Sequence, residues 1–306
     1  MKEISVLAPA TVANVVCGFD VLGFALEEPN DLMTVRFIEK KTVKIINLDD
    51  FNLPTDPEKN VAGVTLLAML EKIDAKIGFE VEITKNIKPG SGIGSSAASA
   101  AGAAAAANRL LDNRFSKLEL VEFAMCGEEL ASGAKHADNV APCIFGGFTL
   151  VREHHPLDVI ELDFPPLFVT IVHPQIEVKT SDAREILKQQ VLLKDAIKQW
   201  ANVAGLVAGL MKGDYNLISR SLEDRIIEPT RSILIPEFDQ IKSESKLAGA
   251  LGGGISGSGP SIFMLSRTWE DARNVEKTMR KTYESIGINF NTYVTKINPD
   301  GVSTVF

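Results

Sequence analysis

The sequence predicts an α+β fold that is divided into two domains. Strand-like and helix-like segments follow one another in mixed runs, without the regular strand–helix alternation of a doubly wound parallel sheet. The chain has 306 residues, a length that suits two domains of ordinary size. The pattern restarts at the double proline at 165–166, so we divide the chain into residues 1–165 and residues 166–306.

The first half opens with short, β-branched segments bounded by proline or asparagine, which are typical of strands. Further along, alanine makes up nine of the eleven residues at 97–107, and alanine is the best helix former. In order, we predict strands at 4–7, 32–38 and 41–46, a helix at 60–73, a strand at 79–84, helices at 97–111 and 117–130, and a strand at 145–152.

The second half opens with an apolar strand at 167–172. The segment 191–211 carries apolar residues on one helical face, which predicts an amphipathic helix. A loop rich in glycine and serine, at 252–261, then leads into another apolar strand. The remaining predicted elements are helices at 181–188, 217–221, 236–245 and 269–283, and a closing strand at 289–296.

The overall charge and the cysteines restrict the partners and the compartment. The formal net charge of −8 argues against nonspecific binding of nucleic acid, which requires a basic face. The three cysteines have unrelated spacings, as free thiols of a reducing compartment do. No segment reads as a signal peptide or a membrane span. We therefore expect a cytoplasmic protein with no nucleic-acid and no membrane partner.

The loop PGSGIGSS, at 89–96, has the features of an anion-binding site. Its three glycines allow positive φ angles and close approach of a ligand to the backbone. Ser95 or Ser96 is expected at the N-cap of the following helix, whose free N–H groups and dipole favour phosphate. The alternative is a flexible turn that only caps a helix. The loop is neither a Walker A motif nor a convincing dinucleotide fingerprint.

A second loop of the same kind, GGGISGSGPS, lies more than 150 residues away at 252–261. Such a loop can also be a simple strand-entry turn. Two loops with so few side chains in one chain nevertheless favour a shared site, because both allow a ligand to touch the backbone. We therefore expect the two loops to line one site.

Polar residues stand out in two further segments. Asn14 and Asp20 lie in the otherwise apolar segment 8–26, where an unpaired buried polar group is costly, so they either form Asx turns or face a ligand. The segment 127–142 concentrates Glu128, Glu129, Lys135, His136, Asp138 and Asn139. It lacks the histidine spacing of a zinc site, whereas Mg²⁺ requires only one or two carboxylate or hydroxyl ligands together with phosphate oxygens.

Taken together, these motifs resemble the GHMP kinase superfamily. The resemblance rests on PATVANVVCGFDVLGFAL at 9–26, PGSGIGSSAAS at 89–99 and GGGISGSGPSIF at 252–263. Two further stretches, SGAKHADNVAPCIFGGF and EPTRSILIPEF, are similar to the members that act on homoserine. The resemblance covers essentially the whole chain, with the motifs in the same order. It implies an N-terminal domain like domain 2 of ribosomal protein S5 and a ferredoxin-like C-terminal domain, with the ligands between them.

The resemblance also implies an activity, cofactors and partners. The implied reaction transfers phosphate from ATP, with Mg²⁺, to the hydroxyl of L-homoserine. The product is O-phospho-L-homoserine, a precursor of threonine. The implied assembly is a homodimer.

Individual positions can be matched to the superfamily's functional residues. The implied ATP contacts are Asn60, on the adenine side, and Pro89, Gly90, Ser91, Gly92, Ile93, Gly94, Ser95 and Ser96 around the triphosphate. The implied Mg²⁺ ligands are Ser96 and Glu128. The implied substrate contacts are Asn14, Asp20, His136, Asp138, Thr180, Arg184, Arg231 and Gly257. Many members of the superfamily use an aspartate as the catalytic base, and the resemblance implies that this aspartate is absent here, with Asn139 nearby. We therefore expect Asp138 and Asn139 to orient the hydroxyl, and the alternative is that Asp138 acts as a base.

Elementary chemistry agrees with part of this assignment. The ammonium group of homoserine favours a carboxylate and an amide oxygen, which Asp20 and Asn14 supply, and its carboxylate favours the forked donors of arginine. Without the resemblance, Arg184 and Arg231 would be read as exposed, ion-paired surface arginines. Two alternative functions remain at this stage. One is a GHMP kinase for mevalonate or a sugar, and the other is a nucleotide-binding regulator without catalysis.

Overall fold

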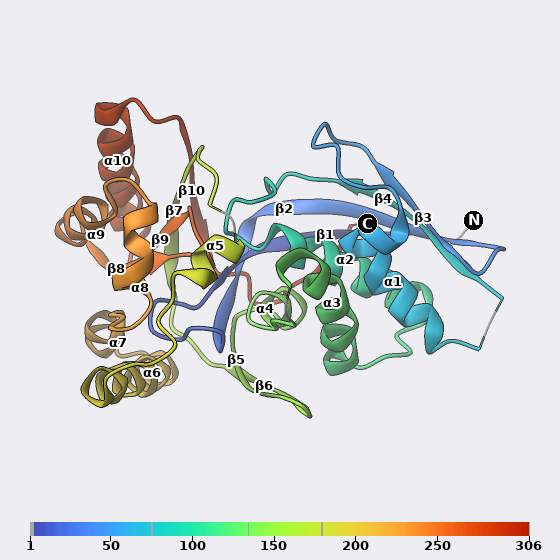
Figure 1. The fold of residues 1–306 in the computed structure, drawn as a ribbon, viewed down its shortest axis with the longest axis horizontal. Coiled ribbons are helices and arrows are strands. Elements are labelled where there is room, and N and C mark those ends of the chain that lie inside the picture. Colours follow the sequence, from blue (N-terminus) through green and yellow to red (C-terminus); the bar gives the residue numbers. More distant parts are fainter. Residues whose placement is uncertain (1–2, 75, 134, 179, 306) are drawn as a thin grey trace.

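The computed structural model describes residues 3–74, 76–133, 135–178 and 180–305, and these residues form two β-sheets with helices packed against each (Figure 1). The two sheets lie side by side along the long axis of the molecule. Among the described residues, no helix combines the length and the apolar character required to cross a membrane.

The first sheet is built mainly from the first half of the chain. Its strands are β1 (Glu3–Ala13), β2 (Leu22–Ile38), β3 (Val43–Asn47), β4 (Gly78–Thr84), β5 (Phe148–His154), β6 (Leu157–Leu162) and β11 (Ser303–Val305). The order β11-β1-β2-β4-β3 forms the main path, and β5 joins β2 to β6. Because β11 pairs with β1, the end of the chain returns to the first sheet.

Helices cover one face of this sheet. They are α1 (Val61–Glu71), α2 (Ser95–Leu110), α3 (Lys117–Ser132) and α4 (Val140–Phe145), with a 3₁₀ turn at Pro57–Lys59. The alanine-rich α2 is the most deeply buried, since all its alanines are at most 6% exposed. It lies against β1 and β2 on one side and against α1 and α3 on the other. Small side chains permit this, and they bring the first turn of α2 close to the sheet.

The second sheet has the strand order β10-β7-β9-β8, with every pair antiparallel. Its strands are β7 (Phe168–Pro174), β8 (Ala250–Ile255), β9 (Ile262–Ser266) and β10 (Phe290–Lys296). Its helices are α5 (Thr180–Glu185), α6 (Leu193–Lys212), α7 (Tyr215–Ser221), α8 (Glu228–Arg231), α9 (Phe238–Leu247) and α10 (Trp269–Ile286), with a 3₁₀ turn at Ser232–Leu234. This is the ferredoxin-like βαββαβ arrangement, which confirms the predicted α+β class.

Several local predictions differ from the structure. The strand predicted at 32–38 begins at Leu22, and the helix predicted at 181–188 ends at Glu185. The strand predicted at 145–152 begins only at Phe148, because residues 140–145 form α4. The strand predicted at 4–7 continues to Ala13, because the pairing with β2 shifts register between Pro9 and Thr11 and so accommodates the proline. The N-cap of α2 is Gly94, in the left-handed conformation, and not Ser95 or Ser96. The division at 165/166 stays a prediction.

Candidate active site

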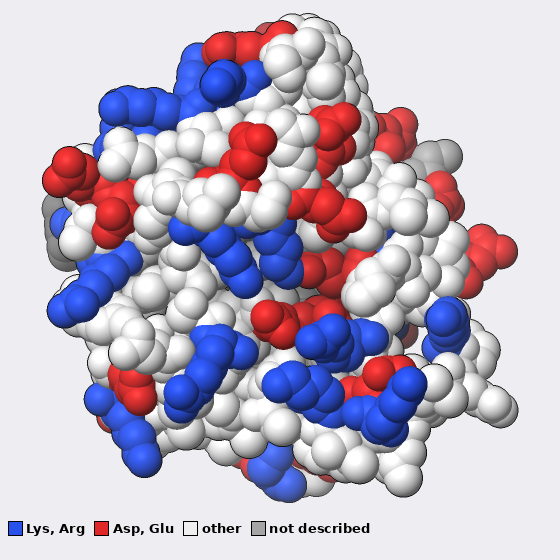
Figure 2. All heavy atoms as spheres, turned by 90° about the vertical axis from the view of Figure 1, so that its left-hand side faces the viewer, with Lys and Arg blue, Asp and Glu red and all other residues white. Residues whose placement is uncertain are grey.

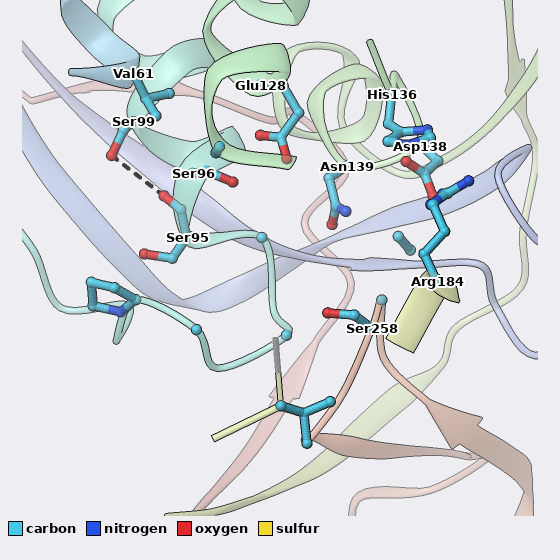
Figure 3. A pocket seen from close by; sticks show the side chains of 18 of the residues that line it. Val61, Ser95, Ser96, Ser99, Glu128, His136, Asp138, Asn139, Arg184 and Ser258 are labelled. Carbon is cyan, nitrogen blue, oxygen red and sulfur yellow. Dashed lines mark hydrogen bonds between the residues drawn. The ribbon is translucent and has the colours of Figure 1, made fainter. Parts of the chain in front are cut away.

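A cavity of about 360 Å³ lies between the two domains and is lined by residues from both (Figure 3). The predicted residues that line it are Asn14, Asp20, Asn60, Pro89, Gly90, Gly92, Gly94, Ser95, Ser96, Glu128, His136, Asp138, Asn139, Arg184, Arg231 and Gly257. In Figure 3, Ser96 and Glu128 lie on one side and His136, Asp138 and Arg184 on the other, with Asn139 between them. Residues far apart in the sequence thus converge on one space.

The loop at 89–94 presents backbone to this cavity. A side chain at Gly90, whose φ is 75°, would meet no atom within 4 Å, so the loop is open to a ligand there. Gly94 ends the loop as the N-cap of α2, and no side chain caps the helix. The first N–H groups of α2, a helix of 16 residues, are therefore available to an anion.

Two predicted ATP contacts do not line the cavity. Ser91 and Ile93 are each 1% exposed, because alternate residues of this tight loop turn toward the protein interior. Their carbonyl groups are used inside the protein. The carbonyl of Ser91 accepts a hydrogen bond from the Ser261 hydroxyl at 2.6 Å, and that of Ile93 accepts one from the Thr11 N–H at 3.1 Å.

The second glycine-rich loop lines the same cavity as the first, and it also supports the first loop. The Ser256 hydroxyl donates to the Gly92 carbonyl at 2.7 Å. The Gly257 carbonyl accepts from Asn14 Nδ2 at 2.8 Å and from Arg231 Nη1 at 3.2 Å. The second loop therefore holds both the first loop and the residues expected to bind substrate.

Sequence reasoning missed Lys85, which directly follows β4. Its ammonium group donates to the carboxylate of Asp31, to the Ser95 carbonyl at 2.7 Å and to the Ser99 hydroxyl at 2.9 Å. The side chains of the Lys85–Asp31 ion pair are at most 1% exposed. Asp31 also accepts from the N–H groups of residues 86 and 87. The sequence signal that could have identified Lys85 is its position. It lies just after a strand with alternating polar and apolar residues and just before a glycine-rich loop.

The candidate magnesium ligands, Ser96 and Glu128, lie together. The Ser96 hydroxyl is hydrogen-bonded to the Glu128 carboxylate. Burial raises the pKa of Glu128 to about 7, an effect that this hydrogen bond opposes. Both donors are oxygens, as a hard cation requires, and they lie beside the N-terminus of α2. The residues present therefore fit a magnesium ion held jointly with phosphate.

Asn60 also lines the cavity, but both ends of its amide are occupied by the protein. Its oxygen accepts from the Gly63 N–H at the start of α1, and its Nδ2 donates to the Pro54 carbonyl at 2.7 Å. Asn60 is therefore an N-cap that shapes the cavity wall. Its neighbour Lys59 and the apolar Leu53, which the sequence did not single out, also line the cavity.

Charged side chains gather at the other end of the cavity. Arg184 forms a forked ion pair with Asp20, with Nη2 at 2.9 Å from Oδ1 and Nη1 at 3.3 Å from Oδ2. His136 Nδ1 lies 3.8 Å from the same carboxylate. Burial lowers the pKa of His136, an effect that the Asp20 charge opposes. The Phe19 ring, also missed by sequence reasoning, contacts two guanidinium groups, those of Arg184 and Arg231.

Arg231 is not a surface arginine, because it is only 3% exposed. Its Nε donates to the Ala183 carbonyl at 2.7 Å, so α5 and α8 are joined through this side chain. Burial, followed by the charge of Arg184, lowers the pKa of Arg231 to about 10. The backbone of Thr180 begins α5, but the side chain of this predicted substrate contact lies outside the described part of the structure.

Asn139 lies between the two ends of the cavity, and Asp138 lies beside His136 and Arg184 (Figure 3). Asp138 is 4% exposed, and burial raises its pKa to about 7, with smaller contributions from the charges of Asp20 and Glu128. Asn139 Oδ1 accepts from the Thr11 hydroxyl at 2.8 Å, which fixes the amide orientation. A carboxyl group with a pKa near neutrality can accept or release a proton at physiological pH.

This fold and site define a small-molecule kinase of the GHMP type. The model of the GHMP kinases N-terminal domain matches residues 60–147, and that of the GHMP kinases C-terminal domain matches residues 206–285. The chain belongs to this family and, within it, to the homoserine kinases.

The similarity to individual relatives extends over nearly the whole chain. The homoserine kinase of Chloroherpeton thalassium is 48% identical over 300 residues, which cover 94% of each chain. That of Methanocella arvoryzae is 43% identical over 97% of this chain and 96% of its own. The crystal structure of homoserine kinase from Cytophaga hutchinsonii matches with a TM-score of 0.95 and 50% identity, over 100% of this chain and 98% of that one.

Proposed function

We propose that this protein transfers the γ-phosphoryl group of ATP to the hydroxyl of L-homoserine, giving O-phospho-L-homoserine for threonine biosynthesis. One observation carries the proposal. A single cavity brings the open loop at Gly90 and the N-terminus of α2 to one end and the Asp20–Arg184 pair, with Asp138 beside it, to the other, and Asn139 lies between them (Figure 3). Such a cavity suits a phosphate chain and an amino acid that meet in the middle.

The phosphate end of the cavity acts through the backbone. The open N–H groups of α2 and its dipole attract the anionic phosphates, and the surrounding loop excludes water from them. Lys85 holds the carbonyl of Ser95 and thus positions the first turn of α2 rather than a ligand. The conformation of this end is therefore set before any nucleotide binds, which favours the in-line geometry of phosphoryl transfer.

Ser96 and Glu128 are the residues that would hold magnesium. When bound, magnesium neutralises negative charge on the phosphates. Glu128 binds a cation only in its ionised form, so its raised pKa makes cation binding stronger as the pH rises through about 7.

The amino-acid end of the cavity supplies opposite charges for a zwitterion. Asp20 and the Asn14 amide suit an ammonium group, and the two arginines suit a carboxylate. The hydroxyl then lies toward Asp138 and Asn139. Asn139 orients it, and Asp138, with its pKa of about 7, can take up its proton as the O–P bond forms.

The alternative functions fit this cavity less well. A neutral sugar provides no carboxylate for Arg184 and Arg231, and mevalonate provides no ammonium for Asp20. A regulator without catalysis is disfavoured because Ser96 and Glu128 are both present and hydrogen-bonded to each other.

The test is an ADP-release assay with ATP and magnesium in which L-homoserine, mevalonate, galactose, L-threonine and L-serine are offered in parallel. We expect release with L-homoserine alone. Release of ADP with another acceptor would support the assignment as a GHMP kinase but contradict L-homoserine as the substrate. ATP binding without release with any acceptor would instead support the regulator.

We further propose a cytoplasmic homodimer without nucleic-acid partners. The outward face of α6 carries Leu193, Ile197 and Trp200, which are 68%, 49% and 56% exposed, and subunit contacts often cover apolar surfaces of this kind. On the face drawn in Figure 2, basic and acidic side chains are interspersed, so this face offers no continuous basic surface to nucleic acid. Light scattering after size-exclusion chromatography tests the dimer, for which one subunit mass is the contradicting result.

A further inference from the structure

Helix α6 is hydrogen-bonded to two walls of the cavity, although it does not itself line the cavity. The described residues that line the cavity include none from α6. Its side chains Gln199 and Asn202 form hydrogen bonds to two segments that do carry cavity residues. One segment is the loop at 14–20, between β1 and β2, and the other is the segment 223–231, which ends with α8. Helix α6 therefore supports the site from outside.

The loop at 14–20 has a backbone conformation that requires such support. Val15 and Val16 have positive φ angles of 41° and 65°. A positive φ is an outlier for a β-branched residue, and it persists only where the surrounding structure imposes it. The start of the loop is held by Asn14, whose Nδ2 donates to the Gly257 carbonyl at 2.8 Å. The middle of the loop needs a support of its own.

Gln199 supplies this support. Its Nε2 donates to the Cys17 carbonyl at 2.8 Å, and its Oε1 accepts from the Arg225 N–H at 2.9 Å. Because both the donor and the acceptor of the amide are used, its orientation is fixed. One side chain thus joins α6 to two segments that lie 182 and 26 positions away in the sequence.

Direct packing between these two segments is incomplete. A cavity of about 10 Å³ lies between them, and it is lined by Val16 and Phe19 from the loop and by Asp224 and Ile227 from the other segment. On the side of the large cavity, the Phe19 ring lies 4.9 Å from the Arg231 guanidinium. This contact depends on the separation of the two segments, which the Gln199 amide sets.

The segment 223–231 has a second bond to α6, because Asn202 Nδ2 donates to the Glu223 carbonyl at 2.8 Å. It is held at its far end as well, where Arg231 Nε donates to the Ala183 carbonyl at 2.7 Å. Loss of the Gln199 amide is therefore expected to release the loop at 14–20 and to leave the segment 223–231 in place.

We propose that Gln199 is a positioning residue of the active site, which acts through the Cys17 carbonyl to hold Phe19 and Asp20 at the cavity. The inference rests on the proposed function, because these residues belong to the end of the cavity where the phosphate acceptor is expected. The phosphate loop at 89–94 is held by the second glycine-rich loop instead. Loss of Gln199 therefore alters the binding of the acceptor and not that of ATP.

The first experiment measures the KM for L-homoserine and the KM for ATP in variants of α6. Gln199→Met removes both hydrogen bonds with little change in side-chain length, and we expect the KM for L-homoserine to rise about tenfold while that for ATP stays within about twofold. Gln199→Glu can still accept from the Arg225 N–H but places a carboxylate against the Cys17 carbonyl, so it is expected to match Gln199→Met. Lys198→Met is the control, because it alters the neighbouring exposed side chain. It is expected to leave both KM values unchanged.

The second experiment does not depend on activity. Cys17 and Cys143, which lies in α4, are 2% and 0% exposed, so neither thiol reacts until the protein around it opens. In Gln199→Met we expect N-ethylmaleimide to label Cys17 about tenfold faster and Cys143 at an unchanged rate, because only the loop opens. Mass spectrometry of proteolytic peptides identifies the labelled thiol.

Four results would overturn the positioning role. They are unchanged labelling of Cys17, equal acceleration of both thiols, faster labelling of Cys17 with an unchanged KM for L-homoserine, and a Gln199→Glu variant that behaves like the unaltered protein. In each case the kinase activity of the unaltered protein still stands. If the unaltered protein does not turn over L-homoserine, the proposed function fails, and the labelling of Cys17 still tests whether Gln199 holds the loop.

Discussion

The two glycine-rich loops have nearly the same composition but different contacts. The loop at 89–94 opens to the cavity at Gly90, where a side chain would meet no atom within 4 Å. The loop at 252–259 also lines the cavity, at Gly257 and Ser258, but its Ser256 hydroxyl donates to the Gly92 carbonyl and its Gly257 carbonyl accepts from Asn14 and Arg231. The first loop is the proposed phosphate site, and the second loop joins it to the proposed substrate pocket.

Gly92 is the point where the two loops meet. A Cβ atom there would lie 2.4 Å from the Gly259 carbonyl oxygen and 2.9 Å from that of Ser256. The glycine is therefore required by loop–loop packing and not by the ligand. A glycine in a loop beside a cavity can thus be required for one of two reasons, the approach of a ligand or the packing of the loop. Only the atoms around the glycine distinguish these reasons.

The largest effect on stability is expected from the buried ionisable groups around the loops. These groups are carboxylates near the first loop and an arginine near the second. Burial raises the pKa of Asp138 from 3.8 to about 7, so the folded state holds a proton that the unfolded state releases between these values. The contribution of Asp138 to the free energy of unfolding of the ligand-free protein therefore falls as the pH rises from about 4 to 7, by an amount on the order of 4 kcal/mol. Asp138→Asn is expected to remove this contribution from chemical denaturation curves and to leave the fall caused by Glu128, whose pKa is also raised to about 7. An unchanged pH profile would contradict the raised pKa.

The contact between the loops is tested by Gly92→Ala. We expect the free energy of unfolding to fall by about 3 kcal/mol, because backbone strain at φ 80° adds to the collision with Gly259. Gly287→Ala is the control for strain alone, since its φ is 70° and its Cβ would meet no atom within 4 Å. Thermal or urea unfolding measures both variants. Equal losses in the two would show that the loops are not tightly packed at Gly92.

The support given by the second loop is tested by Ser261→Ala, which leaves the buried Ser91 carbonyl without its hydrogen bond. We expect a loss of about 2 kcal/mol in stability and a higher KM for ATP. Ser266→Ala is the control, because Ser266 is equally buried and its hydroxyl has no hydrogen-bond partner among the described residues. An unchanged KM for ATP in Ser261→Ala would show that the second loop does not determine the conformation of the first loop.

The smallest effect on stability is expected from Gly90→Ala. Its φ of 75° is strained for alanine, but the open space adds no collision, so the loss is about 1 kcal/mol, as in Gly287→Ala. Unlike that control, it places a methyl group where phosphate is expected and raises the KM for ATP. Equal ATP kinetics in Gly90→Ala and Gly287→Ala would mean that this loop does not touch the nucleotide.

Much of the fold could be predicted from the sequence, because its signals are local. The alanine run gave α2, the amphipathic pattern gave α6, and the glycine spacing gave a loop with positive φ angles at the start of a helix. The motifs also selected most of the residues that line the cavity, including Ser96 and Glu128. These predictions succeed because propensity, periodicity and motif spacing are properties of neighbouring residues.

What the sequence by itself determined was the kind of site and most of its residues. Only the tertiary structure decided how they are held, because this depends on distances between segments far apart in the chain. It paired Lys85 with Asp31 under the first turn of α2, and it stacked Arg184 and Arg231 on Phe19. It also turned Ser91 and Ile93 away from the cavity in which the family resemblance placed them, since packing within a tight loop, and not residue type, sets which groups face a ligand.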